Sequence, residues 1–296
     1  MIAQLNNLLS KAWRDPCYFW YFCRNVNVLR DYFPSIFMRI MSRKSLRLGD
    51  ACALCNIHVI LRTTDFVMNL NASRHLEDYG IITRSDVIKI GACSLFPAAA
   101  KFAATYGKER VRITLVVDRL SEFGMRQYRN AAESVDLDFD VVEAKGHGNG
   151  PTFQTQIDVA LQDDDDTLIF ILEDDYQLDE SALTTCFKVM QEHSNVIGMN
   201  PHFHPDRVRF QDIGKLAVVN GRLYCRVPST CCTFFMSVRQ MRRFEKRLRL
   251  YDGWEKGSIG CAWEKGICLA PLGWTLAEHL HRSDLSPVQK ILPAEV

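Results

Sequence analysis

Three consecutive carboxylates, Glu173, Asp174 and Asp175, follow a short apolar run over residues 168–172. Carboxylates packed at one place repel one another unless a cation or solvent relieves the repulsion. A hard divalent cation with oxygen ligands, Mn²⁺ or Mg²⁺, is the economical explanation, and such a cation would in turn hold a diphosphate. A solvated acidic turn is the alternative, but open parallel sheets bind ligands beyond the carboxyl ends of their strands, where these residues are expected. The spacing therefore predicts a metal site at this turn.

A second acidic run, Asp163–Asp166, comes directly before the same apolar run. Residues that precede and follow a strand lie at its opposite ends, so this run is expected at the far end of the sheet from Glu173–Asp175. A block of like charges without a further signal is typical of a solvated surface. We therefore predict that these four aspartates form a solvated turn.

The elements that must position the carboxylates alternate between strands and helices. Apolar runs rich in β-branched residues predict buried strands over residues 57–61, 111–117, 139–142 and 168–172. Helices are predicted over residues 86–106, from the glycine-rich segment 146–151 to 162, and over 181–192, with Asp179 as the N-cap of the last. Pro97 predicts a kink or a break in the first of them. Alternation of this kind indicates an α/β fold with a mainly parallel central sheet flanked by helices.

Polar residues stand directly after the other predicted strands. Arg62, Thr63 and Asp65 follow the first strand, Asp118 follows the second, and Asn149 opens the helix after the third. The carboxyl ends of parallel strands meet at one edge of a sheet, which is where such sheets bind ligands. These residues are therefore expected at the same edge as Glu173–Asp175.

Together these segments resemble the GT-A glycosyltransferases over about residues 56–285. The resemblance rests on the polar exit of the first strand, on Asp118, on the Gly-Asn-Gly element around Asn149, and on Glu-Asp-Asp as a variant of that family's Asp-x-Asp motif. It implies that Asp175 is a direct ligand of the metal that bridges a nucleotide-sugar diphosphate, with Glu173 and Asp174 beside the sugar or the metal. It also implies a nucleotide site made by Arg62, Thr63, Asp65, Asp118, Asn149 and Asp174, with Asp118 near the base.

The C-terminal third carries weaker signals, which concern the acceptor. Residues 230–237 form another apolar run, and the polar segment 251–257 follows at a distance. Inverting relatives often place an acidic residue in such a segment, where a carboxylate within hydrogen-bond reach removes the proton of the acceptor hydroxyl. Glu255 is the first candidate for this base and Asp252 the second, although Lys256 stands where relatives have another acid.

Histidines offer two further candidate ligands. His279 matches the late histidine that relatives direct to the metal or the diphosphate, and imidazole is a suitable ligand for a first-row divalent metal. His202 and His204 have the spacing of a strand pair, but the prolines on both sides fit a loop as well. We expect His279 at the metal site and the other two on the acceptor side.

The net charge of +1 hides segments of opposite charge. Residues 1–50 carry +5, residues 51–150 carry 0, residues 151–206 carry −11 and residues 207–296 carry +7. The acidic segment contains the predicted metal turn. The basic segment contains a run of cations at 239–249, spaced to lie largely on one helix face. A solvated face is the ordinary interpretation and attraction to an anionic acceptor is the functional one, with nucleic acid the least favoured partner because no binding signature accompanies the run.

Residues 1–50 are predicted to form a helical arm that is aromatic at 17–23 and basic toward its end. This composition suits peripheral contact with an anionic membrane, and packing on the catalytic domain or on a second copy of the chain explains it equally well. The eleven cysteines are scattered and odd in number, which favours a reducing compartment and a cytoplasmic location. Residues 51–296 are predicted to form the catalytic domain, with a nucleotide-sugar half at about 51–176 and an acceptor half at about 177–296.

These features predict a metal-dependent glycosyltransferase that moves a sugar from a nucleotide-diphosphate sugar to a hydroxyl acceptor. A UDP-sugar is the first candidate for the donor, and the reaction is expected to invert the anomeric centre. The acceptor would be a glycan, a glycolipid or another hydroxyl compound, and an anionic one would suit the basic run. A nucleotidyltransferase would share the sheet and the acidic site, but should have a glycine-rich phosphate loop after the first strand, where residues 62–65 contain no glycine. A non-catalytic membrane-associated scaffold would use the arm and would not need carboxylates at three strand ends.

Overall fold

The computed structural model describes residues 46–65, 83–203, 215–230, 232–253, 255 and 257–280, so the predicted N-terminal arm lies almost wholly outside the described residues. The strands are β1 (Asn56–Thr63), β2 (Val111–Val117), β3 (Asp140–Glu143), β4 (Thr167–Glu173), β5 (Tyr176–Leu178), β6 (Val196–Met199), β7 (Leu216–Val219), β8 (Arg222–Arg226), β9 (Phe234–Ser237), β10 (Ile267–Pro271) and β11 (Ala277–His279). The helices are α6 (Arg84–Tyr106), α7 (Glu122–Glu133), α8 (Asn149–Ala160), α9 (Ala182–Glu192), α10 (Val238–Leu248), α11 (Ile259–Lys265) and the short 3₁₀ turn η1 (Lys108–Arg110).

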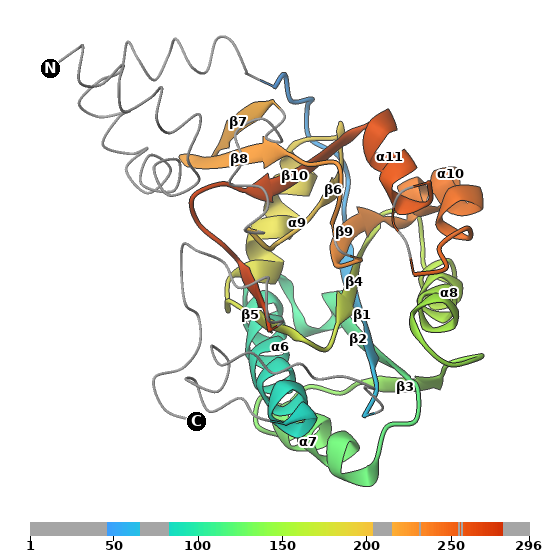
Figure 1. The fold of residues 1–296 in the computed structure, drawn as a ribbon. Helices are drawn as coiled ribbons and strands as arrows, with labels where there is room; N and C mark the ends of the chain where they lie inside the picture. The colour runs from blue at the N-terminus through green and yellow to red at the C-terminus, as the bar shows by residue number, and fades with distance from the viewer. Residues whose placement is uncertain are drawn as a thin grey trace, which may run out of the picture.

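A nine-stranded sheet in the order β3-β2-β1-β4-β9-β6-β10-β8-β7 forms the centre of the described part (Figure 1). The strands β3, β2, β1 and β4 are parallel neighbours. β9 runs antiparallel to β4 and β6, and β8 runs antiparallel to β10 and β7. The predicted α/β class with helices on a largely parallel sheet is confirmed, and every antiparallel pair of this sheet includes at least one of the strands β6 to β10.

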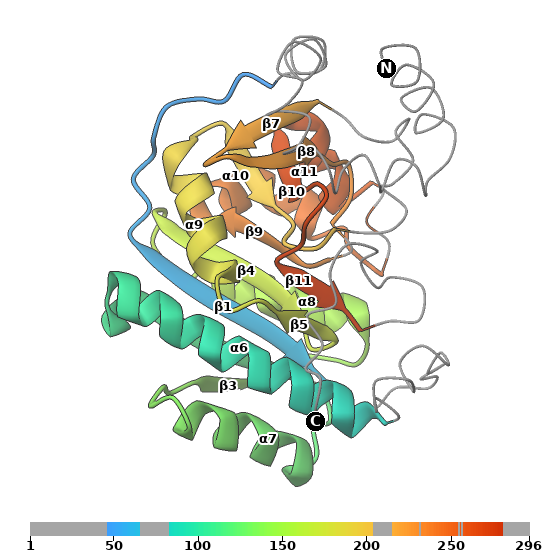
Figure 2. The same ribbon diagram turned by 90° about the vertical axis from the view of Figure 1, so that its left-hand side faces the viewer.

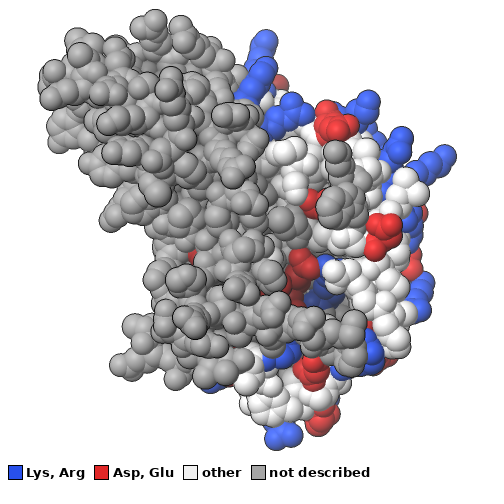
Figure 3. All heavy atoms as spheres, viewed as in Figure 1, with Lys and Arg blue, Asp and Glu red and all other residues white. Residues whose placement is uncertain are grey.

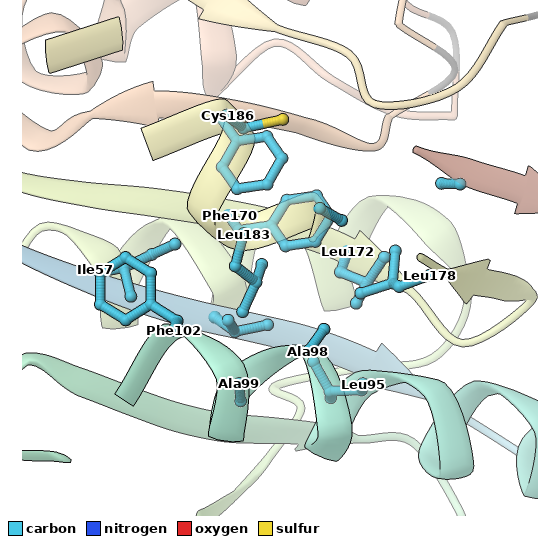
Figure 4. Close-up of a cluster of buried hydrophobic side chains, with 14 of the residues drawn as sticks. Ile57, Leu95, Ala98, Ala99, Phe102, Phe170, Leu172, Leu178, Leu183 and Cys186 are labelled. Atoms are coloured by element: carbon cyan, nitrogen blue, oxygen red, sulfur yellow. The ribbon is translucent and has the colours of Figure 1, made fainter. Parts of the chain in front are cut away.

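Helices cover both faces of the sheet, which explains why its central strands are apolar along their whole length. Leu168, Phe170 and Leu172 of β4 pack with the helices α6, α7 and α9, whereas Ile169 and Ile171 point to the opposite face and pack with α8, α10 and α11. Figure 2 shows α6 and α7 side by side beneath the strands, and Figure 4 shows side chains of α6, β1, β4 and α9 meeting in the first of these cores. The two cores hold β1 and β4 rigidly, which matters because both strands end at the candidate site.

Helix α6 begins with a capping box, in which Thr83 and Asp86 each bond the other's backbone N–H. It continues through Pro97 to Tyr106, so the predicted break does not occur. The buried residues on both sides of the proline, among them Phe96 and Ala98, keep the helix on the sheet. By length and apolar content α6 is the one described helix that could cross a membrane, but 61% of its most apolar window is buried, as in a core helix.

The N-cap of α9 differs from the prediction, and one hairpin was not predicted. Ser181, not Asp179, is the N-cap of α9, and the Asp179 carboxylate instead accepts hydrogen bonds from the Ser181 N–H and hydroxyl. The hairpin β7–β8 turns at Asn220-Gly221, whose φ values of 50° and 74° are those of a two-residue hairpin turn. The Asn-Gly pair is the sequence signal that could have identified this hairpin.

Candidate active site

The carboxyl ends of β1, β2 and β4 bring the predicted strand-end residues to one edge of the sheet. In the parallel pairing of β1 with β4, Arg62 lies opposite Glu173. On the other side of β1, the backbone N–H of Asp118 donates to the carbonyl of Thr63 at 3.0 Å. The prediction that these residues gather at a common edge is therefore confirmed, although the contacts that each one makes could not be read from the sequence.

Glu173 forms an ion pair with Arg62, and both side chains are largely buried. Arg62 also donates from Nη1 to the backbone carbonyl of Asn149 at 2.9 Å, which ties the first residue of α8 to the strand ends. Burial raises the pKa of Glu173, and although Arg62 opposes this, the negative charge of Asp175 adds to it. The Arg62 guanidinium thus stabilises a carboxylate that would otherwise be costly to bury.

Asp174 belongs to a second and separate ion pair, with Arg84 at the start of α6. Its Oδ2 atom also accepts from the backbone N–H of Thr64 at 3.0 Å, and Arg84 donates from Nε to the Thr64 carbonyl at 2.9 Å. Asp174 and Arg84 therefore clamp the residue that follows β1. Sequence reasoning missed Arg84, but the Thr83-x-x-Asp86 capping box would have placed this arginine in the first turn of a helix.

Helix α6 passes directly beneath the acidic turn, and Gly91 is the residue that allows this approach. A Cβ atom at Gly91 would lie 2.7 Å from the backbone carbonyl oxygen of Asp174, which is closer than real Cβ atoms approach a backbone oxygen. Three residues later, the Ser94 hydroxyl accepts from the backbone N–H of Leu178 at 3.0 Å. The helix thus holds the turn between β4 and β5 from below.

Asp175 pairs with His279, the residue predicted to accompany it at the metal. Asp175 Oδ2 lies 3.1 Å from His279 Nε2, and the backbone carbonyl of Asp175 accepts from Leu280 N–H at 2.7 Å. The two are brought together because β5 pairs with β11, and the ring of His279 stacks on Tyr176 with centroids 4.5 Å apart. Burial acts to raise the pKa of Asp175, but the charges of His279, Arg84 and Arg62 outweigh it and hold this pKa at about 2.

Within the described residues, no group of three or more His, Cys, Asp or Glu side chains is assembled to hold a metal. Glu173 and Asp174 are engaged by Arg62 and Arg84, which leaves Asp175 and His279 as possible ligands. The Oδ1 atom of Asp175 is buried and has no hydrogen-bond partner in the described part of the chain. A carboxylate with an imidazole suits Mn²⁺, and Mg²⁺ sites also commonly use one or two protein ligands and complete their shell with phosphate oxygens and water. The donor set therefore fits a site made by Asp175 and His279, whereas the predicted ligands also included Glu173.

The other residues predicted on the nucleotide side contact two loops and helix α7. Asp118 accepts from Gly148 N–H at 2.9 Å and pairs with His147 at 2.6 Å; burial acts to raise its pKa, but these contacts and Arg119 hold it below the usual value. Asp65 accepts from the backbone N–H of Ser121 at 2.6 Å, and the Thr63 hydroxyl contacts the Tyr128 hydroxyl at 3.0 Å. Asp118 and Asp65 thus hold loops that border the edge, and Thr63 contacts helix α7.

The two predicted bases have very different surroundings. The Glu255 carboxylate accepts hydrogen bonds from Ser229, from the backbone and hydroxyl of Thr230, and from the backbone N–H of Cys232 at 2.9 Å. It therefore organises the loop between β8 and β9. Asp252 is exposed, and its Cα would lie 3.4 Å from a Cβ atom placed on Gly150, in the first turn of α8. Asp252 is thus next to the helix start that Arg62 contacts.

Sequence reasoning also missed Tyr251 and Cys232, which lie beside each other and beside Arg62 and Glu173. Burial raises the pKa of both groups, and the negative charge of Glu173 adds to the effect. Cys232 has a φ of 60°, unusual for a residue with a side chain. The loop that Glu255 holds therefore reaches the Arg62–Glu173 pair through Cys232. His202, expected on the acceptor side, is buried and bonds the carbonyl of Ala277 at 2.9 Å, and His204 lies outside the described residues.

No protein-family model and no curated protein matches the chain. Its fold is similar to that of solved glycosyltransferases. The mannosyltransferase PcManGT from Pyrobaculum calidifontis, in complex with GDP-Man and Mn²⁺, is 12% identical with a TM-score of 0.41 over 76% of this chain and 58% of that one. TarS 1–349 from S. aureus, in complex with UDP-GlcNAc, is 10% identical with a TM-score of 0.47 over 76% and 60%, and the galactosyltransferase LgtC, in complex with donor and acceptor sugar analogs, is 13% identical with a TM-score of 0.35 over 71% and 72%. The chain spans less than two thirds of PcManGT and TarS, and similarities this distant assign neither donor nor reaction.

Proposed function

We propose that the chain is a metal-dependent glycosyltransferase that moves a sugar from a nucleotide-diphosphate sugar to a hydroxyl acceptor. The observation that carries the proposal is the pair Asp175–His279 at the edge where β1, β2 and β4 end. One buried oxygen of Asp175 has no partner among the described residues, and its pKa of about 2 keeps the carboxylate ionised at neutral pH. A buried anion with an unsatisfied oxygen is costly unless a ligand completes its shell.

In this proposal the donor diphosphate lies against Asp175 and His279. A divalent metal held there, Mn²⁺ or Mg²⁺, would neutralise charge on the leaving diphosphate. Arg62 and Arg84 lower the electrostatic cost of placing further anions near Glu173 and Asp174, which supports a diphosphate at this position. Thr63, Asp65, Asp118 and Asn149 would border the nucleotide, which we expect to be a uridine nucleotide.

For the acceptor side we propose Asp252 as the general base. Its exposed carboxylate, next to the start of α8, supports this choice, whereas Glu255 already accepts hydrogen bonds from the loop at Ser229–Cys232. Asp252 would take the proton of the acceptor hydroxyl as that oxygen attacks the anomeric carbon and the bond to the diphosphate breaks. The reaction would then invert the anomeric centre. A cytoplasmic location, and a membrane or dimer contact through residues 1–50, stay predictions.

Donor turnover with a panel of nucleotide-sugars tests the proposal. We expect the wild-type chain to release nucleoside diphosphate from one donor with Mn²⁺ or Mg²⁺, and to lose this activity in EDTA. Asp175→Asn should lower the rate by roughly 10²-fold to 10³-fold, the loss that follows removal of one charge-stabilising group at a reacting site. Asp164→Asn, which changes an exposed carboxylate at the other end of β4, is the matched control and should keep the wild-type rate.

The same assay separates the remaining alternatives. Release of pyrophosphate from a nucleoside triphosphate and a sugar phosphate, without turnover of any nucleotide-sugar, would indicate a nucleotidyltransferase. No binding of any donor, with or without metal, would contradict a transferase of either kind. Asp252→Asn should abolish transfer to a hydroxyl acceptor while donor binding persists, and Glu255→Gln should lower thermal stability as well as activity.

A further inference from the structure

The outward side of α10 carries a row of cations that the active site does not use. Arg243 stands four residues after Arg239, Lys246 and Arg247 stand three and four residues after Arg243, and Leu250 stands three residues after Arg247, which places all five on one side of a helix and its continuation. All five are exposed, and Leu250 is 58% exposed. The other side of α10 is buried in the core through Val238, Met241, Phe244 and Leu248. We call the five exposed residues the α10 stripe.

The charges of the α10 stripe are largely uncompensated. Arg239 lies 3.7 Å from Asp165, an aspartate that is already paired with Arg242. In the described part of the chain no ion pair reaches Arg243, Lys246 or Arg247. Figure 3 shows Lys and Arg side chains gathered along the edge of the molecule that α10 and α11 form. A solvated helix face would usually mix both signs of charge, and this one does not.

We propose that the α10 stripe docks the protein on an anionic phospholipid surface. Cationic side chains near such a surface are attracted to it, and each adds to the binding without a shaped pocket. Leu250 favours lipid over a soluble polyanion, because an exposed aliphatic side chain among the cations can enter the headgroup region. The predicted N-terminal arm is not expected to bind the α10 stripe, because residues 1–50 carry a net charge of +5 and would be repelled by its cations. The acidic run Asp163–Asp166 is not expected to bind it either, because Asp163 and Asp165 already have partners.

Sedimentation of the full-length chain with lipid vesicles tests the proposal. Vesicles of phosphatidylcholine alone are compared with vesicles that also contain phosphatidylglycerol. We expect the triple variant Arg243→Gln, Lys246→Gln and Arg247→Gln to bind the anionic vesicles about 100-fold more weakly than the wild type, at roughly fivefold for each cation. Lys108→Gln, Arg126→Gln and Arg129→Gln, an equal change of charge on exposed residues of η1 and α7, should bind as the wild type does.

A second variant separates lipid from other polyanions. Leu250→Ser should weaken binding to anionic vesicles several-fold and leave binding to a soluble RNA oligomer unchanged. Because these side chains are exposed, circular dichroism and the melting temperature should match the wild type. The proposal is overturned if the wild type binds both kinds of vesicle equally, if the triple variant sediments like the wild type, or if the triple variant loses RNA binding alone. None of these readouts depends on glycosyl transfer.

Discussion

Acidic side chains gather at both ends of the parallel strands, but their carboxylates have different partners at the two ends. At the amino end, Asp163 bonds His58 through Oδ2 at 2.6 Å and Arg112 through Oδ1 at 2.9 Å, so both of its oxygens have partners. At the carboxyl end, Asp175 bonds His279 through one oxygen and its other oxygen is buried without a partner in the described part. The number of carboxylates therefore does not distinguish the two ends; the buried Asp175 oxygen that lacks a partner in the described part does.

The acidic run at the amino end also corrects an expectation. Asp163–Asp166 was expected to be a solvated turn, but Asp164 alone of the four residues is exposed and the other three are partly buried. Asp163 joins His58, Arg112 and Thr114 in a polar network at the start of β1 and β2, with Thr114 2.8 Å from His58. Asp165 pairs with Arg242 and fixes α10 to the loop before β4. The run is structural because the cations that neutralise it, Arg112 of β2 and Arg242 of α10, are distant from it in sequence.

Removal of one cation from each end gives the largest expected difference. Arg62→Met leaves the buried Glu173 without its partner and should lower the free energy of unfolding by about 3–5 kcal/mol. Arg242→Met removes a pair in which both side chains are 46% exposed and should cost less than about 1 kcal/mol. Urea unfolding of both variants measures the difference. Equal losses of unfolding free energy would contradict a difference between the two ends. The double variant Arg62→Met with Glu173→Leu should recover much of the stability that Arg62→Met loses.

A smaller effect is expected from the glycine beneath the acidic turn. Ala is the better helix former, so a helical Gly→Ala change stabilises by up to about 1 kcal/mol where space is open. Gly150→Ala meets only ordinary contacts and should follow this rule, whereas Gly91→Ala would push on the carbonyl of Asp174 and should destabilise by about 1–3 kcal/mol. The melting temperatures of the two variants show whether each substitution stabilises or destabilises the fold. Gly91→Ala should also raise the KM for the donor. A stabilised Gly91→Ala variant would refute the close contact of α6 with the turn.

The smallest expected effect is a pH dependence at the amino end. Burial lowers the pKa of His58, even though Asp163 acts to raise it, so the folded state favours the neutral ring. The stability that this contributes is complete above the unfolded pKa of about 6.5 and is lost as the pH falls through the lower folded value. His58→Gln should flatten the fall in stability as the pH drops below about 6.5. His193→Gln is the control, and an unchanged slope in His58→Gln would contradict the assignment.

Sequence reasoning succeeded where a pattern is local. The predicted strand 111–117 coincides with β2, and the predicted strand 168–172 lies within β4, because a run of β-branched and apolar residues between turn signals describes a strand buried on both faces. It failed for β5 and β6, whose three and four residues are too short to show a period. β5 matters most among these, since its pairing with β11 brings Asp175 to His279.

The amino-acid sequence by itself determined the fold class, the edge of the sheet where polar residues gather, and the acidic turn that follows β4. These depend on hydrophobic periodicity and on the rule that parallel strands end together, both of which are local or topological. Only the tertiary structure decided which carboxylate is engaged and which has an unsatisfied oxygen. Arg62, Arg84 and His279 lie about 90 to 110 residues from their acidic partners along the chain, and no spacing rule connects them. Their packing assigns Glu173 and Asp174 to ion pairs and leaves Asp175 as the carboxylate that a ligand can complete.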